Sequence, residues 1–425
     1  MSPYKSSPNA ATARFARPRQ PSRPVVVAIC FAAIVFDGYD LIVYGSTVPS
    51  LLAYEAWSLS LTQVGTIGSY ALLGMFFGAI SAGALTDRFG RRKLFIACLA
   101  LYSIAMLFVA TAPDPTLLSV YRFIAGLGFG GIAPVAIALV VEVARPHERN
   151  RLNAIMLAGL PVGGVLAAIA ALAFLDDVGF RGLWAFGAIA LVTVVPLAWW
   201  YIPESDRTTA ETTRSVPVRQ LVRRKELLAL ILFAAANFVG FLLVFGLNTW
   251  LPQLMRGAGY GIDSALTFLL LLNFGAIAGG FCGSALADRF GSRLVAAGAF
   301  AVATVSVAVM ASAPPTPLMV VATVMAGAGS IGTQIIVFGY VATHYETAVR
   351  ATALGLTTGI GRLGAVSGPL VGGWLLANNF GNAWTFGFFG ATAVIGGIAC
   401  VLVPRRRRTT VEDGNEPALS SAASS

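Results

Sequence analysis

Long runs of apolar residues alternate with short polar stretches along almost the whole chain. An apolar run can cross a bilayer as an α-helix when it reaches about 20 residues. Twelve runs come close to that length or exceed it. Their expected bounds are residues 25–53, 63–85, 94–112, 117–142, 152–175, 183–202, 227–251, 264–286, 294–313, 317–341, 351–376 and 383–403. The pattern therefore predicts an all-α membrane protein with twelve transmembrane helices.

The composition agrees with this prediction. Hydrophobic residues make up 57% of the chain and charged residues 11%, whereas soluble domains carry about 25% charged residues. The cysteines and histidines are scattered singly, at Cys30, Cys98, Cys282, Cys400, His147 and His344. Because these residues form no paired-thiol motif and no ligand cluster, we expect neither a disulfide framework nor a metal site. No nucleophile–base set or phosphate-binding loop is evident, so we also expect no cofactor and no enzymatic activity.

The positions of the basic residues predict the orientation of the chain. An even number of spans places both termini on the same side of the membrane. If that side is the cytoplasm, Arg181 and Arg256 are the basic residues left outside, and Arg122 and Arg362 lie within spans. This asymmetry follows the positive-inside rule, so the net charge of +10 indicates orientation and contact with lipid rather than nucleic-acid binding. We expect a multi-pass protein of a bacterial inner membrane with both termini in the cytoplasm.

The chain also repeats itself at a constant offset of 201 residues, since the tetrapeptide Asp-Arg-Phe-Gly at 87–90 recurs at 288–291. Other matches at this offset are Gly45 with Gly246, Ala112-Pro113 with Ala313-Pro314, Gly126 with Gly327, Gly128 with Gly329, Gly131 with Gly332, Arg149 with Arg350, and Gly163 with Gly364. Two parallel six-helix halves are a transporter arrangement, with the substrate site expected near the midplane between them.

The repeat defines the expected domain organisation. The N-terminal half covers residues 25–202 and the C-terminal half residues 227–403. A polar cytoplasmic linker at 203–226 joins them. Cytoplasmic tails at 1–24 and 404–425 complete the chain.

Four charged residues within the spans occur in one half and not in the other. Asp37 and Asp40 align with Phe238 and Phe241, Arg122 aligns with Thr323, and Arg362 aligns with Pro161. Scaffold features recur in both halves, so the single occurrence of these charges is typical of a substrate or proton site.

Asp37 and Asp40 are the deepest acidic residues in the predicted spans. Asp37 lies twelve residues into the first span, about 18 Å from its start at about 1.5 Å per residue. A carboxylate at that depth costs about 2.5–3.5 kcal/mol on insertion scales. The two aspartates share a helix face, which Tyr44 continues, and like charges this close in a low dielectric favour a carboxyl that takes up and releases a proton. The alternative is a structural pair that is hydrogen-bonded to a neighbouring helix.

Two arginines and several amides are candidates for substrate binding. Arg362 lies among glycines in the eleventh span, and a guanidinium suits a carboxylate. The alternative is a structural ion pair with Asp37 or Asp40. Arg122 lies five residues into its span, from where it could reach the outer surface. The amides that could polarise one side of a cavity, or serve as helix-packing contacts, are Asn237, Asn248, Asn273 and Gln334.

Several motifs together resemble a known family. The loop after the second span contains Gly83, Asp87-Arg88-Phe89-Gly90 and Arg91-Arg92, and it closely resembles the GxxxDRxGRR signature of the major facilitator superfamily. Arg122 with Gly126 and Gly128 is similar to the superfamily's RxxxGxG motif. With Asp37-Gly38-Tyr39-Asp40 and Gly359-Ile360-Gly361-Arg362-Leu363-Gly364 added, the chain resembles the aromatic acid/H+ symporter family over all twelve spans.

This resemblance implies roles for particular residues. Asp37, Asp40 and Arg122 would take part in proton coupling, and Arg362 would be needed for activity. The loop would act as a latch on the cytoplasmic side, unless it is only a topology determinant with a tight turn. The residues assigned to gating are Asp87, Arg88, Gly90, Arg91, Arg92, Glu142, Arg149 and Arg350. The loop between spans 8 and 9 lacks the histidine that some members carry, so no role is transferred there.

The resulting hypothesis is a monomeric transporter that imports an aromatic carboxylate, similar to benzoate or a hydroxybenzoate, together with a proton by alternating access. The carboxylate would dock near Arg362 or Arg122, and the ring would stack on Tyr39, Tyr44 or Phe238. One alternative is another proton-coupled carrier of the superfamily, for a sugar, a dicarboxylate or a drug. A less favoured alternative is a membrane sensor built on a transporter scaffold.

Overall fold

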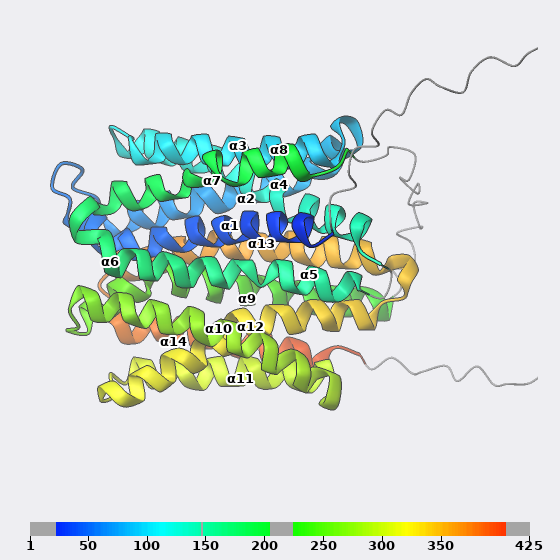
Figure 1. Ribbon diagram of the computed structural model, residues 1–425. Helices are drawn as coiled ribbons and strands as arrows, with labels where there is room; N and C mark the ends of the chain where they lie inside the picture. The colour runs from blue at the N-terminus through cyan, green and yellow to red at the C-terminus, as the bar shows by residue number, and fades with distance from the viewer. Residues whose placement is uncertain (1–22, 146–147, 205–223, 405–425) are drawn as a thin grey trace, which may run out of the picture.

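The computed structural model describes residues 23–145, 148–204 and 224–404, and these residues are helical apart from short turns. The helices are α1 (Arg23–Ala53), α2 (Leu61–Phe89), α3 (Arg91–Ala110), α4 (Pro115–Val143), α5 (Arg149–Leu157), α6 (Gly159–Gly187), α7 (Ile189–Val192), α8 (Val194–Tyr201), α9 (Arg224–Gly257), α10 (Ile262–Phe290), α11 (Ser292–Ala311), α12 (Thr316–His344), α13 (Thr347–Ala377) and α14 (Gly381–Leu402). They run side by side in one bundle (Figure 1). The predicted tails and linker fall almost entirely outside the described residues.

Eleven helices of the described chain are long and apolar enough to cross a membrane. The one remaining predicted span, 183–202, is divided among the end of α6 and two short helices. The prediction placed spans 5 and 6 on either side of a turn near residue 180, and α6 has a non-helical kink there, at Gly179 with a φ of 66°. The chain then returns through the end of α6 and the short helices α7 and α8. Glycine allows this sharp reversal because a positive φ carries no Cβ penalty.

The predicted repeat is confirmed by equivalent packing in the two halves. Gly126 of α4 lies against the carbonyl oxygen of Ala71 in α2. Its repeat partner, Gly327 of α12, lies in the same way against the carbonyl oxygen of Leu272 in α10, which is the residue that the offset of 201 assigns to Ala71. Small residues allow helices to approach this closely in a membrane. The glycines of the repeat therefore build the same helix pairs twice.

The loop signature also has the same backbone form in both halves. Gly90, between α2 and α3, has a φ of 86°, and Gly291, between α10 and α11, has a φ of 87°. L-residues with a side chain rarely adopt this region. Both loops therefore require glycine at this position, whatever further role the surrounding charges have.

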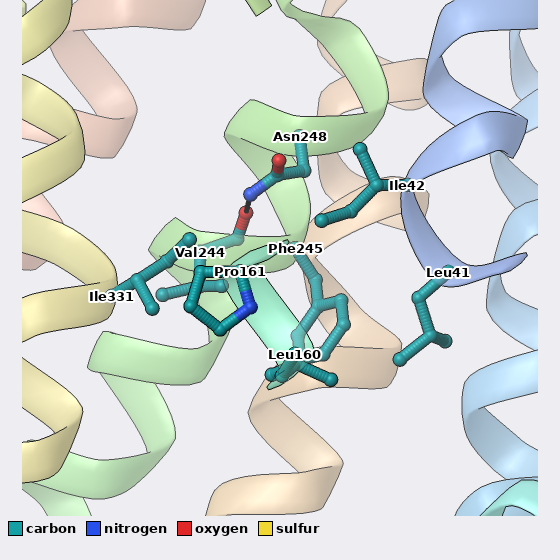
Figure 2. Close-up of a pocket in the computed structure, with 8 residues that line it drawn as sticks. All are labelled: Leu41, Ile42, Leu160, Pro161, Val244, Phe245, Asn248 and Ile331. Carbon is teal, nitrogen blue, oxygen red and sulfur yellow. Dashed lines mark hydrogen bonds between the residues drawn. The ribbon is translucent and has the colours of Figure 1, made fainter. Parts of the chain in front are cut away.

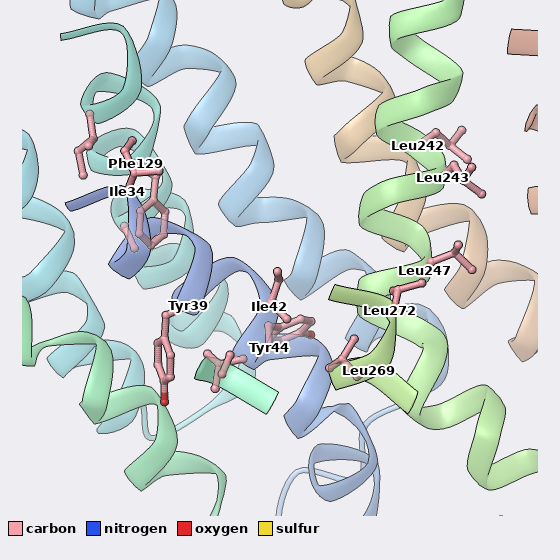
Figure 3. Packing of buried hydrophobic residues seen from close by; sticks show 14 of the residues in the cluster. Ile34, Tyr39, Ile42, Tyr44, Phe129, Leu242, Leu243, Leu247, Leu269 and Leu272 are labelled. Atoms are coloured by element: carbon pink, nitrogen blue, oxygen red, sulfur yellow. The ribbon is translucent and has the colours of Figure 1, made fainter. Parts of the chain in front are cut away.

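Apolar side chains fill the bundle and also cover its outside. Figure 3 shows Tyr39, Tyr44 and Ile42 of α1 in one part of the interior and leucines of α9 and α10 in another. Large apolar residues are exposed around the perimeter, including Ile80, Phe274, Phe281, Val305 and Trp384. An apolar exterior on this scale is typical of a protein surrounded by lipid acyl chains. The chain is a multi-pass membrane protein.

The two halves contact each other mainly away from the end of the bundle where α1 begins and α14 ends. We call that end the terminal end and the opposite one the distal end. On the distal side, Ser69 of α2 donates to the carbonyl oxygen of Val366 in α13 at 2.7 Å, and Gly45 of α1 lies against the backbone of Asn248 in α9. Nearer the terminal end, a methyl group added at Gly83 of α2 or Gly359 of α13 would meet no atom within 4 Å.

Candidate functional site

The two aspartates of α1 lie deep inside the bundle, and each is only 1% exposed. Gly38 between them presses against the backbone of Leu160 in α6, so α1 and α6 are in close contact at this level. Asp37 Oδ1 and both carboxylate oxygens of Asp40 have no hydrogen-bond partner among the described residues. Buried carboxylates without partners are costly. This observation does not fit the alternative of a hydrogen-bonded structural pair.

Asp40 points into the interior of the N-terminal half. Its carboxylate lies directly against Gly187 of α6, where a Cβ atom would collide with it. The cation whose charge acts on Asp40 is Arg122 of α4. Asp40 and Arg122 therefore lie in the same half, near enough for the charge of the arginine to act on the carboxylate.

The Arg122 side chain packs on an aromatic ring inside the bundle and does not extend to the membrane surface. The guanidinium carbon lies 4.0 Å from the centre of the Tyr44 ring, a cation–π distance. The Tyr44 hydroxyl donates to the carbonyl oxygen of Val64 at 2.6 Å and so fixes the ring. Only 4% of Arg122 is exposed. The alternative in which this arginine extends to the outer surface does not apply to this structure.

Asp37 and Arg362 bring charges from the two halves together. The charge of Arg362, on α13, acts on Asp37, whereas that of Arg122 acts on Asp40. Arg362 is half-buried, and its Nη1 donates to the carbonyl oxygen of Met75 in α2 across a long 3.5 Å contact. Because this contact is weak, the guanidinium retains capacity to bind an anion.

The predicted amides separate into two kinds. Asn248 and Asn273 bind each other, because Asn273 Nδ2 donates to Asn248 Oδ1 at 3.0 Å, and both also donate to backbone carbonyls of their own helices. They join α9 to α10. Asn237 and Gln334 are also buried, but neither amide has a hydrogen-bond partner among the described residues.

Asn237 and Gln334 adjoin aromatic rings that the sequence did not single out. The side chains of Asn237 and Phe241 lie against Gly361 of α13, and the amide of Gln334 lies against Gly240 of α9. Phe241 stacks on Phe245, with ring centres 6.1 Å apart and an interplanar angle of 20°. Phe338 of α12 lies 6.1 Å from Phe241.

One signal in the sequence points to these rings. At the offset of 201, Phe241 occupies the position of Asp40, and Phe245 occupies the position of Tyr44. The rings predicted to stack on the substrate are Tyr39, Tyr44 and Phe238, of which Tyr44 packs on Arg122. The Tyr39 hydroxyl donates to the carbonyl oxygen of Leu183 at 2.9 Å inside the N-terminal half. The backbone of Phe238 packs against Gly364 of α13.

A small cavity marks where the halves meet beside this cluster (Figure 2). Its volume is about 20 Å³, enough for about one water molecule. The residues that line it are Leu41, Ile42, Leu160, Pro161, Val244, Phe245, Asn248 and Ile331. An aromatic acid does not fit into this cavity, so such a ligand would need space on the Phe241 side or a movement of the halves.

Most of the residues assigned to gating lie at the terminal end of the N-terminal half, and Arg350 lies at the start of α13 in the C-terminal half. Arg91, at the start of α3, pairs with Glu142 near the end of α4. Arg92 donates to the carbonyl oxygen of Trp199 and lies 3.5 Å from Glu204. Lys93 lies 3.6 Å from the same carboxylate. These contacts tie α3 to α4 and to the end of α8.

The remaining gating residues lie in other surroundings at the same end of the bundle. Arg88 lies over the ring of its neighbour Phe89 at 5.5 Å, and Arg149 is exposed at the start of α5. Nε of Arg350, near the start of α13, has no hydrogen-bond partner within the described part of the chain. Asp87 lies in the last turn of α2, and its side chain falls outside the described part of the structure.

Comparisons with known proteins agree with the motifs. The family model of the Major Facilitator Superfamily matches residues 30–364 and 272–424. The chain is 38% identical to the gentisate transporter of Corynebacterium glutamicum over 91% of its own length and 89% of the relative's. It is 30% identical to the benzoate transport protein of Acinetobacter baylyi, over 90% of each chain.

Solved structures agree on the fold. The D-xylose–proton symporter superimposes with a TM-score of 0.74 at 18% identity, covering 88% of this chain and 96% of the other. An inward-open structure of the xylose transporter XylE from E. coli gives a TM-score of 0.75 at 15% identity, covering 91% and 98%. The matched family and the named relatives are transporters rather than enzymes. The chain belongs to the Major Facilitator Superfamily and, within it, to the aromatic acid/H+ symporter family.

Proposed function

We propose that this protein imports an aromatic carboxylate, similar to benzoate or a hydroxybenzoate, together with a proton across a bacterial inner membrane. It would act as a monomer with both termini in the cytoplasm. The names of the relatives support the substrate class, since they include a gentisate transporter, a benzoate transport protein and a 4-hydroxybenzoate transporter.

One observation carries the proton-coupling part of the proposal. Asp37 and Asp40 are buried three residues apart, with unpartnered carboxylate oxygens, and an arginine charge acts on each of them. An acid in such a place is neutral when it holds a proton and otherwise depends on its cation. Protonation of either aspartate would therefore remove the negative charge next to its arginine, and the arginine could then bind another anion.

Asp37 and Arg362 are the pair that would link proton and substrate. Arg362 is half-buried and is held only by the long contact to the Met75 carbonyl, so it is the better candidate for the substrate carboxylate. Arg122 is packed on Tyr44 inside one half. When Asp37 takes a proton, Arg362 loses its counter-charge, and an incoming carboxylate would restore neutrality. A neutral interface is cheaper to close than one with free charges.

The contacts between the halves support alternating access. They are concentrated on the distal side, around Ser69 with Val366 and Gly45 with Asn248, and Gly83 and Gly359 nearer the terminal end have open space around them. With the termini in the cytoplasm, this is the arrangement expected of an inward-facing state. Exchange of these contacts for contacts at the terminal end would turn the site outward.

The test is transport into proteoliposomes under an imposed inward proton gradient. We expect net uptake of an aromatic acid that a protonophore abolishes, and we expect it to be lost in the double variant Asp37→Asn, Asp40→Asn. Counterflow of labelled against unlabelled acid needs no net proton movement, so the double variant should retain more counterflow than net uptake. Protonophore-resistant net uptake would contradict proton coupling.

A matched control separates the proposed site from a general effect of charge. Asp176, at the distal end of α6, is an exposed carboxylate in the same half, so Asp176→Asn should leave net uptake unchanged. Equal net uptake in the native protein and the double variant would refute the role of the aspartates. Absence of uptake of every aromatic acid tested would refute the substrate class.

A further inference from the structure

A cluster of two amides and three aromatic rings lies in the C-terminal half beside Arg362. We call it the amide–aromatic cluster. It consists of Asn237, Phe241 and Phe245 of α9 together with Gln334 and Phe338 of α12. On each helix the members are spaced by four residues and therefore share one face. The contact of 6.1 Å between the rings of Phe241 and Phe338 joins the two faces, and that of 6.1 Å between Phe241 and Phe245 lies along the face of α9.

The amides of the cluster are buried without hydrogen bonds. Asn237 is 0% exposed and Gln334 is 5% exposed. Among the described residues, the nitrogen and the oxygen of both side chains lack a partner, whereas Asn248 and Asn273 are joined by a hydrogen bond and only Oδ1 of Asn273 lacks a partner. Buried polar groups in proteins are nearly always paired. Four unpaired donor and acceptor atoms beside an aromatic surface therefore indicate a ligand with a polar group on a ring.

The cluster adjoins the residue to which the proposed function assigns the substrate carboxylate. Asn237 and Phe241 lie against Gly361, which directly precedes Arg362 in α13. The phenylalanines are partly exposed, whereas the amides on the same helix faces are buried. A carboxylate bound at Arg362 can thus place its ring on the phenylalanines and direct a ring substituent toward the amides.

The internal repeat argues against a scaffold role for the amides. At the offset of 201, Asn237 corresponds to Phe36 and Gln334 to Ala133, so the other half builds the same helix pairs without them. The glycines that make those helix contacts do recur in both halves. The amides are additions to the repeat, as the aspartates are in the N-terminal half.

We propose that Asn237 and Gln334 bind a hydroxyl group on the substrate's ring, while Phe241, Phe245 and Phe338 contact the ring itself. The protein would then prefer ring-hydroxylated aromatic acids to unsubstituted benzoate. This inference rests on the proposed function, because it assumes that an aromatic acid is bound at Arg362. A site built to bind a hydroxyl rejects the analogue that lacks it, since its own polar groups remain unpaired.

The test compares initial uptake of benzoate with that of 2-, 3- and 4-hydroxybenzoate and the matching methoxybenzoates. For the native protein we expect kcat/KM for the best hydroxybenzoate to exceed that for benzoate by about tenfold or more. The methoxy analogue, which cannot donate a hydrogen bond, should resemble benzoate. The variant Asn237→Leu, Gln334→Met should abolish this preference by lowering uptake of the hydroxybenzoate and sparing benzoate.

A second variant controls for loss of folding. Asn248→Leu removes a paired amide from the same helix and should reduce uptake of benzoate and hydroxybenzoate by the same factor. Equal kcat/KM for the two acids in the native protein would overturn the inference, and this comparison needs no variant. A preference that survives the double substitution would also overturn it. Failure to transport any aromatic acid would refute the proposed function itself, and the two failures are thus distinguishable.

Discussion

At corresponding helix positions, the N-terminal half of the bundle carries charged and polar residues and the C-terminal half carries aromatic residues. In the N-terminal half, Asp40 and Tyr44 lie next to Arg122, which packs on the tyrosine ring. In the C-terminal half, the corresponding positions of α9 hold Phe241 and Phe245, which stack on each other. A repeat-related glycine packs on the backbone of each of these helices, since Gly163 lies against Val35 of α1 and Gly364 lies against Phe238 of α9. A repeated scaffold can therefore present charge on one side of a midplane site and an aromatic surface on the other.

This difference suggests that the two halves have different functions in transport, and the internal repeat provides matched positions for a test. Each substitution in one half has a counterpart at the repeat-related position of the other. If the halves are specialised as proposed, matched substitutions at functional positions should give unequal effects. Those at scaffold positions should give equal effects.

The largest difference in net uptake between matched substitutions is expected at Arg122 and its counterpart Thr323. Arg122→Gln removes the cation whose charge acts on Asp40 and should lower net uptake by about 100-fold or more, because the cycle would then have to bury the ionised Asp40 without a counter-charge. Thr323 only donates to the carbonyl oxygen of Met319 in its own helix, so Thr323→Ala should change uptake by less than about twofold. Initial rates in proteoliposomes, normalised to the amount of protein, measure both. Similar losses would indicate that the halves are not specialised here.

The repeat-related glycines should instead respond alike. Gly126→Ala and Gly327→Ala would each force a methyl group against a backbone carbonyl of the neighbouring helix. Overpacking of this kind destabilises by about 1–3 kcal/mol, and we expect equal decreases in thermal unfolding temperature in detergent. Gly298→Ala, at a position in α11 with open space, should cause no decrease. A loss confined to one half would contradict equivalent packing.

Phe245 and Tyr44 occupy corresponding positions, but substitution of Phe245 should change KM, whereas substitution of Tyr44 should change stability. Phe245→Leu removes a ring from the amide–aromatic cluster, and aromatic contacts of this kind contribute about 0.5–1.5 kcal/mol, so KM should rise about two- to tenfold. Tyr44→Phe keeps the ring under Arg122 and loses the bond to Val64. That loss should lower stability by about 1 kcal/mol and leave KM unchanged. A raised KM in Tyr44→Phe would place the substrate in the N-terminal half instead.

The smallest effect is expected at the terminal end. Arg91 pairs with Glu142, whereas the repeat-related residues Ser292 and Thr343 carry no charge. Both partners of the pair are partly exposed, and such ion pairs contribute about 0–1 kcal/mol. A double-mutant cycle of Arg91→Gln and Glu142→Gln, followed by thermal unfolding, should give a coupling energy within that range. A larger value would point to a latch that dominates the stability of this state.

Much of the architecture was predictable because the membrane imposes strong constraints. Apolar length located eleven spans directly, and the kink at Gly179 lies where the prediction separated spans 5 and 6, whereas the breaks beside α7 leave no hydropathy signal. The repeat followed from matching glycines, and these proved to be the contacts that bring the helices together. The candidate charges were visible because a buried aspartate or arginine is rare in a span.

What the sequence determined by itself is the set of helices, their order, the repeat and the identity of the buried charges. Only the tertiary structure decided which neighbours these residues have. Asp37 and Asp40 share a helix face, yet one meets the charge of Arg362 in the other half and the other meets that of Arg122 in its own half. Likewise, four similar amides divide into the bound pair Asn248–Asn273 and the unpaired Asn237 and Gln334. Helical periodicity determines the direction of a side chain on its own helix, but its partner depends on how helices far apart in the chain pack together.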